Sequence, residues 1–311
     1  MSITIVICTH DRASSLESAL QSLTRVERPE RNDIDLLVVA NACSDHTPAL
    51  LNHLAREGLA NGVPCRWLEE PRPGKSFALN RAIAETDADA LCFIDDDQLV
   101  EEGFLEALSQ GVAAYPDHEI ICGKMRPAWD GSEPAWVHET GHYQIPIRPF
   151  PEFDFGDAPQ DVDPAVKLPS GGNITVRRSV FSTAGTFSTQ IGPAGHNLKG
   201  GEDLEFLRRC VASGARIRYV PSIRQLHTIE PSRMAMGYMI RKSYWRSLSS
   251  ILISDKPLDR LRPYMITKPV RLAVLALFSL RQNRRFYYLI RTASALGELH
   301  ATMSLQFGRA K

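Results

Sequence analysis

The chain has 311 residues, with 36 Lys and Arg against 36 Asp and Glu, and six cysteines without CxxC spacing. This length allows one large domain with an appendage or two domains, and the composition is ordinary for a soluble protein. The scattered cysteines argue against disulfides and against a cysteine-based zinc site, and they indicate buried thiols in a reducing compartment. The chain begins with an apolar run that lacks the features of a signal peptide, so we expect a cytoplasmic protein.

Charge is unevenly distributed along the chain. Residues 232–311 hold 15 Lys and Arg against three acidic residues, which leaves 21 against 33 in residues 1–231. Such an asymmetry indicates two regions with different partners. We therefore predict a domain over residues 1–231 and a basic helical extension over residues 232–311.

The first 125 residues alternate strand-like and helix-like segments. Apolar runs predict strands at 3–8, 34–39, 65–68, 91–94 and 120–122, and helical spacing predicts helices at 16–23, 49–54 and 77–84. This order is typical of a parallel sheet with helices on both faces. Because ligands of such sheets bind beyond the carboxyl ends of the strands, the polar stretches "THDR", "NACSD" and "DDD" mark the predicted site.

Residues 126–169 interrupt this alternation with eight prolines and six large aromatic side chains. A long loop region in a compact domain usually has a function, and flat rings suit sugar faces and lipid stems. We expect a wall of the acceptor site here, and a cover for the core is the alternative. Further on, the patterns predict a helix at about 202–213, a strand at 216–220 and helices from about residue 232.

Three consecutive carboxylates, Asp95, Asp96 and Asp97, follow the predicted strand at 91–94. Two like charges about 4 Å apart repel by roughly 4 kcal/mol at an effective dielectric near 20, so a neutralising partner is expected. A divalent cation is the simplest partner, and an acidic turn fully exposed to water is the alternative.

Six stretches taken together carry a more specific signal. They are "VICTHDR", "VVANACSDHT", "RPGKSFALNRAI", "FIDDD", "SGGNITVRR" and "GGEDLEFLRR". Their order and rough spacing resemble those of the inverting family-two glycosyltransferases over about residues 3–230. This resemblance implies an α/β GT-A fold, which is Rossmann-like with a mostly parallel sheet and flanking helices, and it implies a nucleotide-sugar donor.

The resemblance also implies a divalent metal at the acidic strand end. Asp97 resembles the metal ligand of the family's DxD-type triplet, with Asp95 near the ribose or the water shell of the metal and Asp96 beside them in the donor site. Hard oxygen ligands favour Mn²⁺ or Mg²⁺. His227 corresponds to a further metal ligand of some family members, and a packed or surface histidine is the alternative.

Two further stretches are assigned to the donor by the resemblance. Thr9, His10 and Arg12 match a segment that lies against the nucleotide. Near the diphosphate, the resemblance places the start of a helix that contains Lys75, Asn80 and Arg81. For the two cations, solvation on an exposed helix face is the alternative.

The second predicted strand departs from the family pattern. Relatives often end this strand with Asp-Asn, whereas this chain has Ala40 and Asn41. Loss of that carboxylate leaves the identity of the base open, and we expect Asn41 and Asp45 to take over part of the contact. Gly172 and Asn173 are expected to let the backbone approach the donor sugar, because glycine permits a close pass that a side chain would block.

Glu202 and Asp203 are the predicted catalytic pair. Inverting transfer needs one carboxylate to remove a proton from the attacking acceptor hydroxyl, and Asp203 matches the aspartate of the family's "ED" motif. Glu202 is expected to orient this base or to contact the acceptor. The alternative is an acidic first turn of a helix, which is favourable to the helix dipole and common.

The predicted function is transfer of a sugar from a nucleotide-sugar to the hydroxyl of a saccharide or lipid-linked acceptor, in bacterial surface polysaccharide or glycolipid synthesis. The alternatives are a catalytically silent nucleotide-sugar-binding protein and a sugar-1-phosphate nucleotidyltransferase. The second lacks support because "THDRASS" has no Gly-rich, Arg-containing loop after the first strand. We expect no nucleic-acid partner.

The basic extension has two predicted partners. Its longest apolar run, residues 272–280, is well below the roughly 20 residues that span a bilayer. Leu272, Leu275, Ala276 and residues 278–279 form one apolar side among flanking cations, which predicts peripheral contact with the inner face of a membrane. Packing against the catalytic domain or against a second subunit in a homodimer is the alternative.

Overall fold

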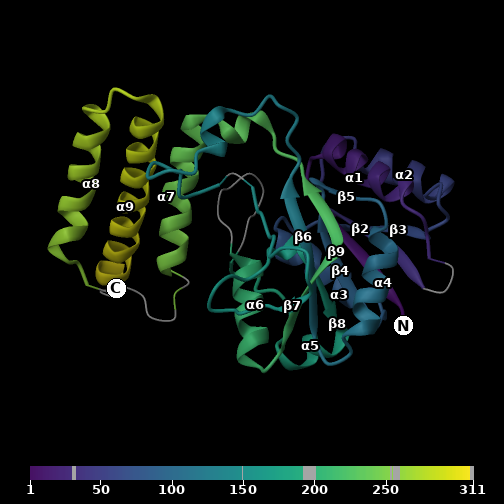
Figure 1. Ribbon diagram of the computed structural model, residues 1–311. Helices are drawn as coiled ribbons and strands as arrows, with labels where there is room; N and C mark the ends of the chain where they lie inside the picture. The colour runs from purple at the N-terminus through teal and green to yellow at the C-terminus, as the bar shows by residue number, and fades with distance from the viewer. Residues whose placement is uncertain (30–32, 149, 192–200, 253, 255–259, 309–311) are drawn as a thin grey trace. The chain divides into compact units, whose positions relative to one another are not determined.

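Nine strands among the described residues form one mixed β-sheet (Figure 1). The computed structural model describes residues 1–29, 33–148, 150–191, 201–252, 254 and 260–308. In spatial order the strands are β3 (Cys65–Glu70), β2 (Ile34–Asn41), β1 (Ile3–Thr9), β4 (Ala90–Asp95), β8 (Ile174–Arg177), β6 (Ile120–Pro127), β9 (Ile217–His227) and β5 (Gln98–Val100). A short strand, β7 (Gln160–Asp161), pairs with β9.

The strands β3, β2, β1 and β4 are parallel to their neighbours, whereas β8 is antiparallel to both β4 and β6. Strands β6 and β9 are parallel, and β5 is antiparallel to β9. Within the β4–β8 pair, Phe93 faces Ile174 and Ala90 faces Arg177. The beginning of β8 therefore lies beside the carboxyl end of β4, and the residues that precede β8 reach the edge where the predicted site lies.

Two hydrophobic clusters cover the two faces of the sheet. On one face, Ile5 and Ile7 pack with residues of α1 (Ala13–Arg25), α2 (Thr47–Glu57) and α4 (Phe104–Ala114). On the other face, Val6 packs with residues of α3 (Lys75–Ala84), α5 (Arg178–Thr183) and α6 (Glu202–Ala212). Neighbouring residues of a strand point to opposite faces, so the apolar run of β1 supplies both clusters.

The β6–β9 pair is irregular at Gly123. The register shifts between Gly123 and Lys124, where the partner residue moves from Val220 to Arg224. A Cβ atom on Gly123 would lie 2.1 Å from the carbonyl oxygen of Ile223, so this close approach requires a glycine.

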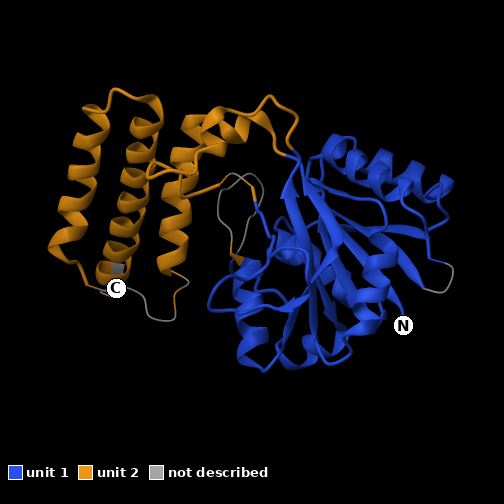
Figure 2. Ribbon diagram, viewed as in Figure 1, with its two compact units in different colours: residues 1–128, 151–196, 202–228 blue, residues 129–150, 197–201, 229–311 orange. Residues whose placement is uncertain are grey.

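The chain divides into two compact units (Figure 2). Unit 1 comprises residues 1–128, 151–196 and 202–228, and it contains the sheet. Unit 2 comprises residues 129–150, 197–201 and 229–311. Its helical elements are η1 (Ala135–His138), η3 (Pro231–Met234), α7 (Met236–Leu252), α8 (Pro263–Leu277) and α9 (Gln282–Gly308).

Helix α9 packs against both α7 and α8 in unit 2 (Figure 1). Ile145 and Ile147 join Met239, Phe286 and Ile290 in its hydrophobic core. Gly297 of α9 permits a close approach to α7, because a Cβ atom there would lie 2.2 Å from the carbonyl oxygen of Tyr244. No helix among the described residues is long and apolar enough to cross a membrane.

The predicted α/β architecture is confirmed, with three differences. Strand β9 continues to His227, beyond the predicted end at residue 220, and neither α4 nor β5 was among the predicted elements. The aromatic segment 126–169 is shared between the two units. Phe153 is 1% exposed and its ring centroid lies 6.0 Å from that of Tyr219, so at this position the alternative, a cover for the core, is correct.

Candidate active site

The carboxylates at the end of β4 are bound by residues at the end of β1. Thr9 Oγ1 donates a hydrogen bond to Asp96 Oδ2 at 2.7 Å. The Arg12 guanidinium forms ion pairs with Asp96 and, at 3.0 Å, with Asp97 Oδ2. Burial raises the pKa of Asp96 to about 7, against the lowering effect of Arg12, and Asp97 raises it further. Since Asp96 and Asp97 are both buried, the triplet is not an acidic turn exposed to water.

Asp97 also faces His227 at the end of β9. His227 Nε2 lies 3.3 Å from Asp97 Oδ1, and both side chains are buried. Two neighbouring ligands of an octahedral Mg²⁺, each about 2.1 Å from the ion, are about 3 Å apart. A carboxylate oxygen and an imidazole nitrogen at the observed separation therefore fit one shared divalent ion. Nδ1 of His227 is buried and has no hydrogen-bond partner among the described residues.

Lys75, the first residue of α3, forms an ion pair with Asp95. Burial lowers the pKa of Lys75, but the carboxylates of Asp95, Glu202 and Asp203 outweigh this effect and raise the pKa above its ordinary value. Lys75 is therefore charged, and it interacts electrostatically with Asp95 at the end of β4 and with Glu202 and Asp203 at the start of α6. The alternative of a merely solvated cation is wrong for this residue.

A turn of two glycines before β8 connects these carboxylate groups. The backbone N–H of Gly171 donates to Asp203 Oδ2 at 2.9 Å. A Cβ atom on Gly171 would lie 2.8 Å from Asp203 Cβ, and one on Gly172 would lie 2.5 Å from Asp95 Oδ2. The two glycines thus bring the backbone directly between the β4 carboxylate and the α6 carboxylate, which no larger residue would allow.

Glu202 and Asp203 begin α6 but differ in their surroundings. Glu202 is buried at 4% exposure, whereas Asp203 is half-buried. Burial raises the pKa of Glu202 to about 7; Lys75 lowers it, and Asp203 and Asp95 raise it. Asp203 is therefore the more solvent-accessible carboxylate of the pair, and Glu202 is the one whose pKa is raised by burial.

The three asparagines of the predicted site bind backbone groups. The Asn41 amide donates to the carbonyls of Glu70 and Arg72 at 3.0 and 2.7 Å and accepts from Gly74 N–H at 2.8 Å. Asn80 exchanges two hydrogen bonds with the backbone of Phe187, at 2.8 and 2.9 Å. Asn173 does the same with Gly123, at 2.7 and 3.0 Å. These amides fix the loops and strands around the site.

His10 and Arg81 also have partners outside the carboxylate cluster. Nδ1 of His10 lies 2.7 Å from the carbonyl oxygen of Asn41, so this ring connects the ends of β1 and β2. Arg81 pairs with Glu85 one helical turn away at 3.0 Å and is exposed. Arg81 forms no ion pair with the triplet among the described residues.

Asp45 belongs to a second group of candidate ligands, with Asp11 and Cys43, whose ligand atoms lie within 4.8 Å of one another. Asp45 accepts hydrogen bonds from the N–H groups of Ala13 and Thr47, and Asp11 accepts from Ser44 and from the N–H of Asp45. Burial raises the pKa of the Cys43 thiol, which keeps it protonated. This group stabilises the starts of α1 and α2, and its donor atoms fit a metal poorly.

Comparison with known proteins identifies the family. The family model for glycosyl transferase family 2 matches residues 4–185. The chain belongs to glycosyl transferase family 2. The match contains the carboxylate triplet and the two-glycine turn, while Glu202, Asp203 and His227 of this glycosyltransferase lie beyond it.

Curated relatives cover most of the glycosyltransferase. It is 22% identical over 250 residues to a glucosyl-dolichyl phosphate glucuronosyltransferase of Haloferax volcanii. The aligned region covers 80% of this chain and 76% of the relative. It is 24% identical over 246 residues to the succinoglycan biosynthesis protein ExoM of Rhizobium meliloti, with 78% and 72% covered.

Solved structures support the fold. The mannosyltransferase PcManGT from Pyrobaculum calidifontis, in complex with GDP-Man and Mn²⁺, matches with a TM-score of 0.59 at 16% identity and covers 99% of this chain and 87% of that chain. TarS residues 1–349 of S. aureus, in complex with UDP-GlcNAc, match with a TM-score of 0.51 at 15% identity, covering 99% and 92%. The expected GT-A fold is thereby confirmed.

Two residues at the site of the glycosyltransferase were not predicted from the sequence. Gln98 is fully buried, and its Oε1 accepts the backbone N–H of Asp95 at 3.1 Å. The N–H and hydroxyl of Thr228 both donate to the carbonyl of Asp97, at 2.8 and 2.9 Å. Gln98 directly follows the triplet and Thr228 directly follows His227. Their positions next to predicted site residues are the sequence feature that could have identified them.

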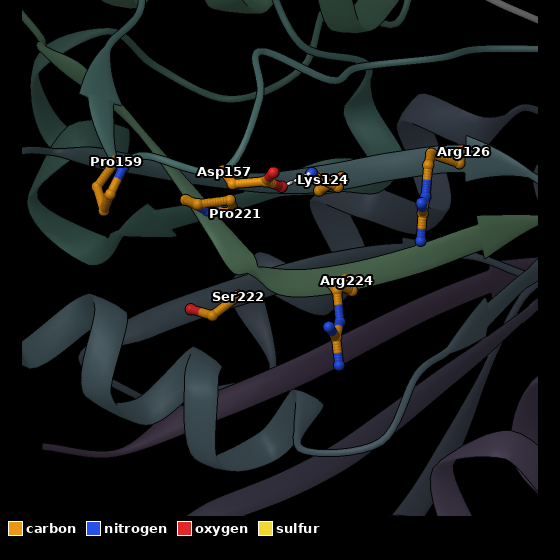
Figure 3. Close-up of a pocket in the computed structure, with 7 residues that line it drawn as sticks. All are labelled: Lys124, Arg126, Asp157, Pro159, Pro221, Ser222 and Arg224. Atoms are coloured by element: carbon orange, nitrogen blue, oxygen red, sulfur yellow. Dashed lines mark hydrogen bonds and ion pairs between the residues drawn. The ribbon is translucent and has the colours of Figure 1, made fainter.

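A separate pocket lies along β6 and β9 and contains none of the predicted site residues (Figure 3). Its cations lie near carboxylates: Lys124 Nζ lies 2.6 Å from Asp157, and Arg126 and Arg224 share Glu101 at 3.5 and 3.8 Å. These five side chains carry three positive and two negative charges.

Proposed function

We propose that this protein is a metal-dependent, inverting glycosyltransferase that moves a sugar from a nucleotide-sugar to an acceptor hydroxyl. The observation that carries the proposal is the meeting of three carboxylate groups at one edge of the sheet. Asp97 with His227, Asp95 with Lys75, and Asp203 on Gly171 all lie there. This edge is where parallel α/β sheets bind their ligands.

Asp97 and His227 would hold the Mn²⁺ or Mg²⁺ ion, because they present a carboxylate oxygen and an imidazole nitrogen 3.3 Å apart. When bound, such an ion offsets the negative charge on a departing diphosphate. Asp96 is the less suitable ligand, since Thr9 and Arg12 already occupy its oxygens. Arg12 and Thr9 would hold the triplet in place while the donor binds.

Asp203 is the proposed base. It would take the proton of the acceptor hydroxyl while that oxygen bonds to the anomeric carbon, and the bond from this carbon to the diphosphate oxygen breaks on the opposite face. The Gly171 N–H fixes the orientation of the Asp203 carboxylate through the 2.9 Å hydrogen bond. Lys75 would oppose the rise that burial causes in the pKa of Glu202, because a nearby cation favours the charged form of a carboxylate.

The base of the donor nucleotide would be bound with little help from Asn41, whose amide already bonds to three backbone groups. The same holds for the partly buried Asp45 and Asn80, because both side chains bond to backbone groups of loops and helix starts. Donor recognition would therefore rest on backbone groups of these loops and on the residues of the triplet edge.

The proposed setting is synthesis of a surface polysaccharide or a glycolipid at the inner face of a membrane. The names of two relatives support it, a glucosyl-dolichyl phosphate glucuronosyltransferase and a succinoglycan biosynthesis protein. The acceptor would be a saccharide or a lipid-linked sugar.

A donor panel tests the function. Nucleotide-sugars are screened by thermal shift with Mn²⁺, and the best donor is then assayed for release of nucleoside diphosphate. Asp97→Ala should abolish both donor binding and its dependence on the metal, as measured by titration calorimetry with and without EDTA. The control Asp87→Ala removes an exposed carboxylate before β4 and should change neither. Equal donor affinity with and without EDTA would contradict the metal assignment, and binding without turnover would identify a silent binding protein.

A further inference from the structure

Helix α8 is apolar on two opposite sides. Its inner side, made of Met265, Pro269, Leu272 and Ala276, is buried in unit 2. The outer side carries Ile266, Val270, Val274 and Leu277, which are 57%, 62%, 46% and 74% exposed. Their spacing of four, four and three residues places the outer four in one stripe along the helix.

The stripe continues past the end of the helix. Phe278 is 77% exposed and Leu280 is 101% exposed, and Tyr264 at the other end is 45% exposed. From Ile266 to Leu277 the stripe is about 17 Å long at 1.5 Å per residue. Monomeric proteins rarely expose a continuous apolar surface of this kind without a partner for it.

Cations without carboxylate partners border the stripe. Arg262, Arg271, Arg281 and Arg285 are exposed and form no ion pair within the described part of the chain. Lys268, in contrast, pairs with Glu298 of α9 at 2.8 Å. Residues 260–285 contain no acidic residue at all. The partner of this surface must therefore be apolar in its centre and negatively charged around it.

We infer that the outer side of α8 inserts into the interfacial layer of an anionic membrane. Aliphatic side chains would enter the boundary between headgroups and acyl chains, and the arginines would bind the phosphates around them. A second copy of this chain is a poorer partner. A symmetric contact through the stripe would bring the same unpaired arginines of two copies together, and like charges there repel.

This inference changes part of the apolar side expected from the sequence. Leu272 and Ala276 of that side are buried within unit 2, whereas Phe278 is exposed and belongs to the proposed lipid-facing surface. The inference deepens the proposed function and rests on it only for the choice of a lipid-linked acceptor. Its test contains no donor and no metal, so it fails or succeeds independently of sugar transfer.

Vesicle flotation of the full chain tests the apolar part of the surface. Vesicles of phosphatidylcholine with phosphatidylglycerol are compared with pure phosphatidylcholine at low salt. The double change Val270→Ser with Leu277→Ser should lower the partition coefficient on the anionic vesicles by about tenfold or more, because two exposed aliphatic side chains no longer leave water. The control Val166→Ser changes a 71% exposed residue of unit 1 and should have no effect.

Neutralising the arginines tests the charged part. Each of Arg271→Gln, Arg281→Gln and Arg285→Gln should weaken binding to anionic vesicles by about fivefold, and added salt should weaken the unmodified chain in the same way. Arg25→Gln and Arg56→Gln, exposed positions of unit 1, serve as matched controls. Circular dichroism confirms that the variants keep their helices.

Two results would overturn the inference. One is that the unmodified chain ignores anionic vesicles at low salt, or binds them as well after the stripe is changed. The other comes from sedimentation equilibrium without vesicles: a dimer that Val270→Ser with Leu277→Ser converts to monomer would assign the surface to a second copy of the chain.

Discussion

The cations at the sheet edge of unit 1 and those around α8 of unit 2 differ in their partners. In unit 1, Arg12 and Lys75 are each bound to a carboxylate of β4, and the charges lie at a partly buried edge of the sheet. In unit 2, the arginines around α8 are exposed and have no carboxylate partner among the described residues, and exposed aliphatic side chains lie on the same helix. Cations that pair with particular carboxylates fix the positions of those side chains. Unpaired cations beside an apolar stripe suit a partner that is extended and fluid.

The largest effect is expected when the proposed base at the sheet edge of unit 1 is removed. Asp203→Asn should lower turnover by roughly 10² or more, the usual scale for a general base, while donor affinity stays near its original value. Donor affinity is measured by calorimetry and turnover by diphosphate release. Glu205→Gln is the control, since Glu205 lies on the same helix and pairs with Arg209. Nearly intact turnover in Asp203→Asn would make Asp203 a structural residue.

The second test changes the distance between the two carboxylate groups. A Cβ atom on Gly172 would meet Asp95 Oδ2 and Gln98 Nε2, each at 2.5 Å, so Gly172→Ala must displace the turn or the carboxylate. A displacement of about 1 Å near reacting groups can cost roughly 10²-fold in rate. We expect a loss of turnover of that size with a folded protein, assessed by thermal unfolding.

Gly237→Ala provides the comparison for this turn. An added Cβ at Gly237, in α7 of unit 2, meets nothing within 4 Å. Turnover of Gly237→Ala should equal that of the unmodified enzyme. If Gly172→Ala were equally active, the two-glycine turn would not set the geometry of the site.

The third and smallest effect concerns pH. The folded state holds the proton of Glu202 more tightly than the unfolded chain, since burial raises the pKa from 4.5 to about 7. The free energy of unfolding that this group contributes is therefore full below about pH 4.5 and is lost as the pH rises through about 7. A shift of this size corresponds to about 3 kcal/mol.

Glu202→Gln should remove this loss, because glutamine resembles the protonated acid and cannot ionise. Urea unfolding at pH 5 and pH 8 in EDTA gives the change in free energy for both proteins. The charged groups around Glu202 are Lys75, Asp203 and Asp95, and all three remain in the variant. An identical pH dependence in the two proteins would show that Glu202 does not titrate in this range.

The sequence alone predicted the sheet and the edge that carries the site. Apolar runs predict buried parallel strands, and the carboxyl ends of such strands lie at one edge of the sheet. The carboxylates after β4 and the polar residues after β1 were therefore expected to lie together. Arg12 and Asp97 do so at 3.0 Å. The three residues of β5 were too short a run to stand out.

Hydrogen bonding to distant backbone could not be predicted from the sequence. The amide of Asn80 binds the backbone of Phe187, 107 positions along the chain, and the amide of Asn173 binds Gly123, 50 positions away. A sequence motif specifies a residue type, but it does not specify the hydrogen-bond partner of that side chain. The residues carried over from the family pattern therefore remain proposals for donor binding.

The predicted apolar side of α8 is wrong at Leu272 and Ala276, which are buried, for a different reason. Hydrophobic periodicity selects a buried side only when the opposite side is polar. Val270, Val274 and Leu277 make the outer side as apolar as the inner one, so the pattern had no unique direction. Similarly, the packing of Ile145 and Ile147 on α7 and α9 joins segments far apart in the sequence, which periodicity does not report.

The order of the ion pairs along the chain has a consequence for folding during synthesis. Arg12 and Lys75, the cationic partners of the triplet, both precede Asp95 in the sequence. As the chain leaves the ribosome from its N-terminus, the carboxylates of β4 emerge after the groups that neutralise them. The strands β1 to β4 can therefore assemble without a stretch of unopposed negative charge. Asp203 emerges more than a hundred residues later, when two cations already face the three carboxylates of the triplet.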